Sequence, residues 1–378
     1  MAGASQPSRQ KKMKTLDFRD LKIWKRQLPD VKFAVLPSSN NRPNPLAVED
    51  RLYASVFAPG AICSLERDKG KLIWRRSLHK YSGAAVSLHQ QSLLTHTPTT
   101  VFALKPESGE TRWSFCPYGD KGEVIYSSPT GFKDYVYVGD RPGYLHCLDA
   151  NDGKTVWKKL TNRAENSNVN STPVIVNNLV LVTTNASTIV AYESASGKLA
   201  WKRELDGPST YGPVLHGELV LAVSDSLYAF NPRTGGLRRR LSWKGRKVQQ
   251  ADSTGKGITV MFWPETPKTK LPPDKREAEK IAAKEEPSVT LAFVAKSGKR
   301  HLQNVAAFCP SFRYERNTGF IYLSHLHGVD VIHATTGAIA YHLTTDEGNG
   351  NGLGLVDVKD RIMYVLNGDG IVWALRHP

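Results

Sequence analysis

The chain has 378 residues, of which 40% are hydrophobic, and its formal net charge is +16. No stretch approaches the ~20 apolar residues that a membrane-spanning helix needs. Residues 1–27 are polar and basic, and are not expected to be a signal peptide or a lipoprotein leader. The four cysteines, Cys63, Cys116, Cys147 and Cys309, stand alone, and unpaired cysteines fit a reducing compartment. These features predict a cytoplasmic protein.

The N-terminal region divides into two parts. Residues 1–15 are predicted to form a disordered basic tail, because they are polar and show no apolar pattern. The segment 21–28 reads Leu-Lys-Ile-Trp-Lys-Arg-Gln-Leu and resembles the segment 199–205, Leu-Ala-Trp-Lys-Arg-Glu-Leu. This likeness indicates that the first strand of the chain belongs to the same series as later strands.

From residue 64 onward, one sequence motif recurs with a period of ~40 residues. It has a small residue, a large apolar residue, four mostly polar residues, a glycine and, four positions later, a tryptophan. Four copies contain both marked residues: Gly70 and Trp74, Gly109 and Trp113, Gly153 and Trp157, and Gly197 and Trp201. Three weaker copies have Gly235, Gly298 and Gly337, with Arg239, Leu302 and Tyr341 at the tryptophan position. A fixed period indicates one repeated architecture, and we expect a single domain over residues 16–378.

Each copy is predicted to contain four short strands. In the fourth copy, β-branched runs at 172–176, 179–182 and 189–192 alternate with turns, one of them at residues 177–178. Gly197 ends another tight turn, where a positive φ is easiest without a side chain. The tryptophan that follows offers a large apolar face that can pack on the next copy. Four strands per copy are typical of propeller blades.

The last copy accounts for the N-terminal strand. Residues 353–356, 362–366 and 371–375 supply three strands of an eighth copy but no fourth. We expect the segment 21–28 to complete this blade, which would place Trp24 beside Ala374. Closure of this kind pairs the exposed edges of the ring. The predicted fold is an all-β, eight-bladed β-propeller of four-stranded antiparallel blades, closed by the N-terminal strand in the last blade.

The repeat resembles that of the PQQ-like, or quinoprotein-type, β-propeller family, which is typically written Ala-x-Asp-x-x-Thr-Gly-x-x-x-Trp. Residues 147–157, Cys-Leu-Asp-Ala-Asn-Asp-Gly-Lys-Thr-Val-Trp, match this pattern closely, and residues 191–201 match it nearly as well. The resemblance covers most of the chain from Leu21 to Leu375. It implies the fold, which hosts several activities.

Two branches of the family differ in function. Its dehydrogenases have adjacent cysteines over the quinone, a calcium ion held by carboxylate and amide ligands, and an aspartate base, and they are longer than this chain. Its non-enzymatic members include the outer-membrane assembly type and interaction propellers. Because this chain has no Cys-Cys pair, we carry over no catalytic, cofactor-binding or metal-binding residue and expect no cofactor.

Two stretches of the sequence concentrate the positive charge. Residues 1–28 have a net charge of +6, and residues 231–257 have a net charge of +7. The second stretch is expected at the last strand of blade five and the connection to blade six. Its candidate binding residues are Arg238, Arg239, Arg240, Arg246 and Lys247. Such a cluster attracts an acidic protein or a nucleic acid, but it can also be a solvated face that only confers solubility.

A second group of candidates precedes the first strand of three copies. The segments 126–129, 170–173 and 210–213 place hydroxyl and amide side chains before a proline, near the expected central channel. For a ligand at the channel mouth, the candidate residues are Tyr126, Ser127, Asn170, Ser171 and Tyr211. The alternative is that these residues only turn the chain into the innermost strand.

A charged insertion interrupts blade six at residues 264–288. Its first half is rich in proline, whereas residues 274–286 contain strong helix formers and are predicted to form a short exposed helix. The insertion is either a docking element or a tolerated decoration.

These observations predict a non-catalytic PQQ-like propeller that acts as a binding scaffold in a larger complex, with a basic face for an acidic protein partner. The alternatives are a PQQ-dependent oxidoreductase-like protein and a nucleic-acid-associated propeller. The sequence leaves the oligomeric state open.

Overall fold

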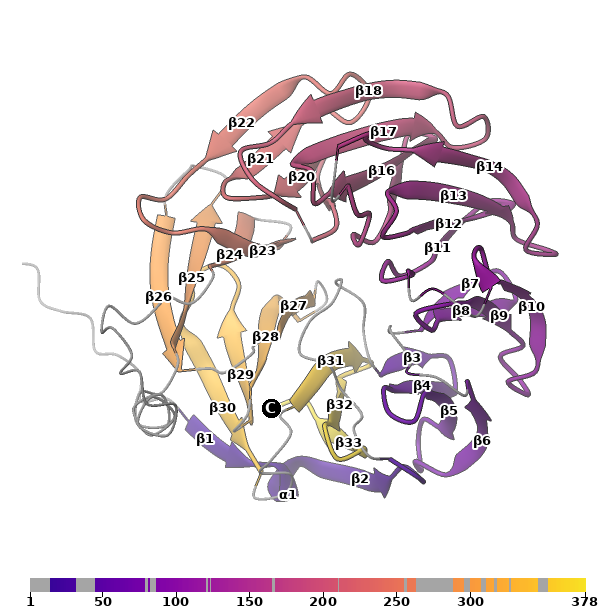
Figure 1. The fold of residues 1–378 in the computed structure, drawn as a ribbon. Helices are drawn as coiled ribbons and strands as arrows, with labels where there is room; N and C mark the ends of the chain where they lie inside the picture. The colour runs from indigo at the N-terminus through magenta and orange to yellow at the C-terminus, as the bar shows by residue number, and fades with distance from the viewer. Residues whose placement is uncertain are drawn as a thin grey trace, which may run out of the picture.

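The structure, a computed structural model, is a ring of eight β-sheets around a central axis (Figure 1). It describes residues 14–31, 45–78, 81, 86–119, 122, 124–164, 167–209, 211–254, 257–262, 288–295, 300–306, 311–315, 318–325, 328–345 and 353–378. Within these ranges, seven sheets have four strands and one has five. The predicted eight-bladed propeller is therefore confirmed.

The blades are numbered in chain order, and the strands of each run from the innermost to the outermost. Blade one comprises β3 (Leu46–Val48), β4 (Arg51–Val56), β5 (Ala61–Glu66) and β6 (Leu72–Ser77). Blade two comprises β7 (Ser87–His89), β8 (Ser92–His96), β9 (Val101–Leu104) and β10 (Thr111–Phe115). Blade three comprises β11 (Thr130–Phe132), β12 (Tyr135–Gly139), β13 (Tyr144–Asp149) and β14 (Thr155–Leu160). Blade four comprises β15 (Val174–Val176), β16 (Leu179–Thr184), β17 (Thr188–Glu193) and β18 (Leu199–Glu204).

The second half of the ring follows the same plan. Blade five comprises β19 (Val214–His216), β20 (Leu219–Val223), β21 (Leu227–Phe230) and β22 (Leu237–Leu241). Blade six comprises β23 (Val248–Ser253), β24 (Gly257–Phe262), β25 (Ser288–Ala295) and β26 (Arg300–Ala306). Blade seven comprises β27 (Ser311–Glu315), β28 (Phe320–His325), β29 (Gly328–His333) and β30 (Ile339–Thr344), and blade eight begins with β31 (Leu353–Lys359), β32 (Ile362–Asn367) and β33 (Ile371–Arg376).

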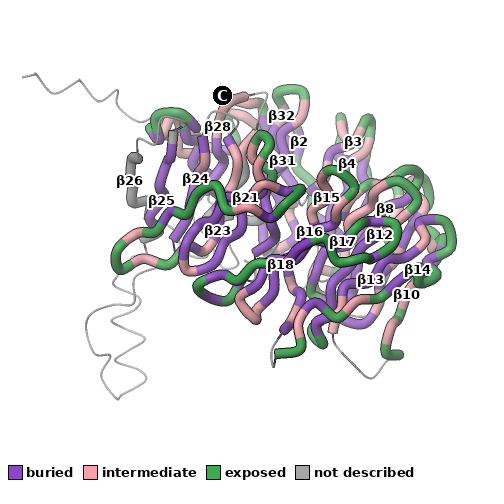
Figure 2. The backbone as a smooth tube through the Cα atoms, turned by 90° about the horizontal axis from the view of Figure 1, so that it is seen from above, coloured by how far each residue is buried: buried purple, intermediate pink, exposed green. Residues whose placement is uncertain are grey.

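Turn chemistry explains why the strands end where they do. Asn177 and Asn178 connect β15 to β16 with φ values of 52° and 60°, as a two-residue hairpin of positive φ requires. The middle strands of each blade are buried on both faces, and the exposed residues lie mainly at the turns and on the outer strands (Figure 2). The core is thus a series of apolar layers between neighbouring blades.

Tryptophans on five outer strands contact the glycine turn of the next blade. A Cβ atom added to Gly153 would lie 2.6 Å from Cε3 of Trp113, and one added to Gly197 would lie 2.7 Å from Cδ2 of Trp157. The same arrangement joins Trp24 to Gly70, Trp74 to Gly109 and Trp201 to Gly235. We call these five pairs the Trp–Gly contacts. They confirm the expectation that each tryptophan packs on the neighbouring copy.

Each of these indoles also makes a polar contact with the next blade. The Nε1 atom donates a hydrogen bond of 2.8 to 3.0 Å to a backbone oxygen, the acceptors in ring order being Arg67, Pro106, Ala150, Ser194 and Pro232. A buried indole N–H needs such a partner. One residue type therefore supplies both apolar packing and a directional bond at every one of these interfaces.

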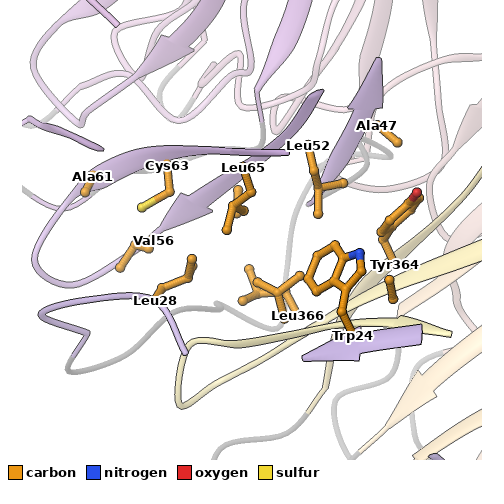
Figure 3. Close-up of a cluster of buried hydrophobic side chains, with 13 residues drawn as sticks. Trp24, Leu28, Ala47, Leu52, Val56, Ala61, Cys63, Leu65, Tyr364 and Leu366 are labelled. Carbon is orange, nitrogen blue, oxygen red and sulfur yellow. The ribbon is translucent and has the colours of Figure 1, made fainter. Parts of the chain in front are cut away.

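The N-terminal strand closes the ring in blade eight. β2 (Lys22–Gln27) pairs antiparallel with β33, and Trp24 lies opposite Ala374, as predicted. The backbone N–H of Leu28 donates to the carbonyl of Gly370 at 2.9 Å. Figure 3 shows Trp24 beside Leu52 of blade one, in the cluster of buried side chains that joins blades eight and one.

The predicted boundaries of the N-terminal region require two corrections. Lys14 and Thr15 were expected in the disordered tail of residues 1–15, but they belong to β1 (Lys14–Asp17), which pairs parallel with β30. The outer edge of β30 offers unpaired backbone groups, and the extended segment pairs with them. Leu21 was expected in the closing strand of residues 21–28, but it ends the short helix α1 (Phe18–Leu21). The Asp17 side chain caps this helix by accepting a hydrogen bond from the backbone N–H of Arg19 at 2.7 Å.

Residues 1–13 of the predicted tail and 264–287 of the predicted insertion lie outside the described residues, and Ser288 begins β25. None of the helices in the described ranges has the length and apolar character that crossing a membrane requires.

Candidate binding surfaces

The fourth strands of the eight blades, counted from the axis, are β2, β6, β10, β14, β18, β22, β26 and β30, and they differ from the rest of the chain in charge. In blade seven, β1 with Lys14 and Asp17 lies outside β30. The basic residues of the fourth strands are Lys22, Lys25, Arg26, Arg75, Arg76, Arg112, Lys158, Lys159, Lys202, Arg203, Arg238, Arg239, Arg240 and Arg300, and their one acidic residue is Glu204. These strands lie on the circumference of the ring (Figure 1). The charge that the sequence shows as two stretches is thus distributed in space along most of the rim.

Among these strands, β22 carries three consecutive arginines. Arg238, Arg239 and Arg240 are all exposed, and so is Leu237, whereas Leu241 is buried. Within the described part of the chain, the guanidinium groups of Arg238 and Arg239 make no hydrogen bond or ion pair. Two adjacent guanidinium groups are therefore available to a partner, one on each face of the strand.

Arg240, the third of these arginines, is engaged inside the protein. One of its guanidinium nitrogens donates to Oδ2 of Asp206 at 2.7 Å, and the guanidinium lies over the Tyr228 ring. The hydroxyls of Ser224 and Ser226 also donate to this carboxylate. Arg240 therefore fastens the outer strand of blade five to the connection that enters the blade.

The pKa of Asp206 reflects this cluster. Burial acts to raise the pKa, but the hydrogen bonds from Ser224, Ser226 and Arg240 outweigh burial and lower the pKa to about 2. The carboxylate is consequently charged at any physiological pH. The cluster is a fixed anionic anchor for Arg240.

The other two basic candidates are also engaged by the protein. Arg246 donates to the hydroxyl of Thr290, and its guanidinium lies over the Phe262 ring. Lys247 forms an ion pair of 2.8 Å with Asp225. Of the five predicted basic residues, the structure thus leaves two, Arg238 and Arg239, without such a contact among the described residues.

The channel-mouth candidates hold neighbouring blades together. The Ser127 hydroxyl donates to the Ser171 carbonyl at 2.9 Å, and the Ser171 hydroxyl donates to the Thr183 carbonyl at 2.9 Å. Thr183 then donates to the carbonyl of Tyr211 at 2.8 Å. The series links blades three, four and five through buried hydroxyls, and it agrees with the structural alternative for Ser127 and Ser171.

The remaining channel-mouth candidates differ in exposure. Tyr126 is exposed, and the Arg141 guanidinium lies 5.4 Å from the centre of its ring. Tyr211 is buried, and burial raises the pKa of its hydroxyl. The side-chain oxygen of Asn170 is buried without a hydrogen-bond partner in the described structure. The structure thus does not bring the five side chains together on one open surface, and a ligand role for them stays a prediction.

One polar cluster was not predicted. In blade three, the buried Asp140 carboxylate accepts hydrogen bonds from the Tyr118 hydroxyl at 2.7 Å and the Tyr144 backbone N–H at 2.7 Å, and lies 2.8 Å from Nε2 of His146. Lys158 on the outer strand donates to the Tyr118 oxygen at 3.1 Å. No spacing in the sequence signals this cluster, because its members come from a turn, a connection and two strands.

Two further observations concern metal ions and cysteines. In the described ranges, no group of three or more His, Cys, Asp or Glu side chains is arranged to hold a metal ion. Cys63 and Cys147 are free and buried, and burial raises the pKa of each thiol to about 12. Both side chains therefore behave as small apolar residues of the blade core.

A comparison with known protein families finds a match in the part of the chain where the Trp–Gly contacts repeat. Residues 98–256 match the PQQ-repeat model described as "Outer membrane protein assembly factor BamB". The repeat is a PQQ-like propeller repeat. The matched residues run from blade two to blade six and include blades three, four and five in full. Blades three and four each have a Trp–Gly contact on both sides.

Curated proteins and solved structures extend this result. The outer membrane protein assembly factor BamB of Shewanella oneidensis is 30% identical over 162 residues, which are 41% of this chain and 35% of that protein. The corresponding protein of Yersinia pestis is 26% identical over 148 residues, 39% of this chain and 36% of that protein. The matched part thus spans little more than a third of these relatives. The quinohemoprotein alcohol dehydrogenase of Comamonas testosteroni has a TM-score of 0.70 at 13% identity, covering 94% of this chain and 76% of that chain, and shares the fold.

The comparisons correct the expected location. The prediction of a cytoplasmic protein is wrong, because the relatives that match are named as outer membrane protein assembly factors. The prediction rested on the polar, basic N-terminal residues, on the lack of a long apolar stretch and on the unpaired cysteines, and the cysteines carry no information on location. Cys147 occupies the small-residue position of the repeat, where Ala191 stands in the next blade, so its lack of a disulfide partner reflects packing and not the redox state of a compartment.

Proposed function

We propose that the chain is a non-catalytic PQQ-like propeller that acts as a protein-binding scaffold, with a basic surface on its rim for an acidic protein partner. The observation that carries the proposal is the charge of the fourth strands of the blades, where Glu204 is the one acidic residue among many Lys and Arg residues. Clustered charge of one sign steers an oppositely charged partner and selects against like-charged ones.

The other features of the molecule support a scaffold. The Trp–Gly contacts and the closure by β2 hold the blades in a fixed ring, so binding residues on the rim are presented without rearrangement. The relatives that match the repeat are named as assembly factors, which fits a protein that works by contacting other proteins. Arg238 and Arg239 of blade five are the best placed rim residues, because they are consecutive, both exposed, and have no side-chain partner within the described chain.

The test is charge reversal at blade five. The wild-type protein is expected to capture acidic proteins, which are detected after cross-linking. The variant Arg238→Glu/Arg239→Glu should no longer capture them, and its urea unfolding midpoint should be unchanged. Arg240 is left intact, because a glutamate there would face the Asp206 carboxylate. The matched control is Lys69→Glu/Lys71→Glu, which makes the same charge change in an exposed turn of blade one, across the ring. Equal capture by the blade-five variant and the wild type would contradict the proposed surface.

The non-catalytic part of the proposal has a separate test. The protein is incubated with pyrroloquinoline quinone and calcium, and the absorbance of retained quinone and the reduction of a dye with alcohol substrates are measured. We expect neither retention nor dye reduction. Stoichiometric quinone retention together with dye reduction would identify an oxidoreductase instead.

A further inference from the structure

The outer edge of blade five is an open strand edge. β22 is the last strand of its sheet, and no strand in the described ranges pairs with its outer side. Such an edge presents backbone N–H and C=O groups in a row, ready to pair with another extended segment. Blade seven shows the result within this molecule: β1 adds to the outer edge of β30 as a fifth strand, with Leu16 paired to Leu343.

Blades five and seven share a feature that the tryptophan-bearing blades lack. Arg239 and Tyr341 occupy the position where those blades have a tryptophan that reaches the next blade. The basic residues of the tryptophan-bearing strands are partly used in the same way: Nε of Arg26 donates to the Gly70 carbonyl at 2.8 Å, and Nε of Arg203 donates to the Gly235 carbonyl at 2.8 Å. In β22, neither Arg238 nor Arg239 is used for such a bond within the described chain.

From this edge we infer that β22 binds an extended acidic segment of a partner protein, which adds to blade five as a fifth strand. The inference rests on the proposed function and specifies the binding mode. Arg238 and Arg239 point to opposite faces of the strand, so they match two consecutive Asp or Glu residues on the added strand. Leu237, which is 55% exposed, adds an apolar contact at the start of the strand.

Charge selects the acidic segment over a second copy of this chain. Two β22 edges pairing with each other would bring the arginines of both strands close together, and like charges on adjacent strands are destabilising. The same arginines become favourable when the incoming strand is acidic. The edge is therefore protected against self-association and open to a partner of opposite charge.

Three blocked peptides provide the test. The first alternates valine and threonine around a central Asp-Glu pair, the second has Lys-Lys in its place, and the third is the Asp-Glu peptide N-methylated on alternate backbone amides. Their affinities for the full chain are measured by calorimetry. We expect the Asp-Glu peptide to bind, the Lys-Lys peptide not to bind, and N-methylation to weaken binding at least tenfold, because it removes the backbone donors that strand pairing requires. Hydrogen exchange of the β22 backbone amides should slow only with the first peptide.

The variants separate this inference from the proposed function. Arg238→Glu/Arg239→Glu should weaken the Asp-Glu peptide about tenfold or more, whereas Lys69→Glu/Lys71→Glu should leave its affinity unchanged. Equal binding of the methylated and unmethylated acidic peptides would overturn strand addition but retain a basic surface. If neither acidic peptide binds, the proposed basic surface is overturned as well. Sedimentation of the free protein gives a further outcome. If the wild type is a dimer and Arg238→Glu/Arg239→Glu is a monomer, the edge pairs with a second copy of the chain, and the inference is overturned.

Discussion

The interfaces between the blades form two groups that are held together by different means. From blade eight round to blade five, each of five interfaces has a Trp–Gly contact with an indole hydrogen bond. From blade five round to blade eight, the tryptophan position holds Arg239, Leu302 or Tyr341. The fold thus tolerates loss of its repeated contact in three consecutive interfaces.

Two of the three interfaces in the second group use aromatic residues from outside the repeated motif. Trp243 packs edge-on against Phe262 at a centroid distance of 5.0 Å, between blades five and six. Phe18 of α1 packs edge-on against Trp373 at 5.5 Å, in the cluster shared by blades seven and eight. The comparison shows that a propeller needs a well-packed interface between neighbouring blades, but not the same residue at every interface.

The largest expected effect is at a Trp–Gly contact. Trp157→Ala removes a buried indole and its bond to the Ser194 carbonyl, and should lower the free energy of unfolding by about 3–5 kcal/mol. Arg239→Ala, at the equivalent position of blade five, should change it by less than about 0.5 kcal/mol, because the side chain is exposed. Urea denaturation followed by circular dichroism measures both. Similar losses in the two variants would show that the two groups of interfaces do not differ as described.

A smaller effect is expected from the glycine side of the contact. Gly153→Ala and Gly217→Ala both place a side chain at positive φ, 74° and 59°, which costs about 1–2 kcal/mol. In Gly153→Ala the new Cβ would also meet Trp113, whereas at Gly217 nothing lies within 4 Å. We expect an additional loss of about 1–3 kcal/mol for Gly153→Ala. Equal unfolding midpoints for the two variants would mean that the backbone alone, and not the indole, requires the glycine.

The sequence predicted the parts of the fold that depend on repetition. The spacing of Gly153 and Trp157 recurs, so one physical argument about a turn and a packing face applied to five interfaces at once. The closing pair of Trp24 and Ala374 followed from the same pattern. The strand β1 could not be predicted, because Lys14–Asp17 has a single large apolar residue and its pairing depends on the edge of β30, near the other end of the chain.

The candidate surfaces were only partly predictable for a related reason. The sequence shows the charge of Arg240 but not the Asp206 carboxylate that binds it, since the two lie 34 residues apart and meet only when the blade forms. It places Ser127 near the axis but cannot show that the Ser171 carbonyl accepts its hydrogen bond. Residue type and approximate position are therefore readable from the pattern, whereas the availability of a side chain is decided by tertiary contacts.

The smallest expected effect tests whether blade five is held by its own polar cluster in addition to its neighbours. The pKa of Asp206 is about 2 in the folded protein, below the value of about 3.9 for an unfolded aspartate. A lowered pKa means that the carboxylate stabilises the fold above pH ~4, and that this contribution is lost as the pH falls from about 4 to about 2. Asp206→Asn should therefore be less stable than the wild type at pH 7, by about 1 kcal/mol because solvent around the half-exposed Arg240 screens the pair.

The difference between the Asp206→Asn variant and the wild type should shrink as the pH approaches 2. Urea midpoints between pH 7 and pH 2 measure it. Asp152→Asn is the control, because that carboxylate pairs with Lys154 in an open turn where solvent screens the interaction, and its midpoint should follow the wild type more closely. A constant difference between Asp206→Asn and the wild type over the whole range would show that the carboxylate contributes shape and hydrogen bonds but no charge. In that case Arg240 would be held by its hydrogen bond to Asp206 and by the Tyr228 ring, and not by the charge of the carboxylate.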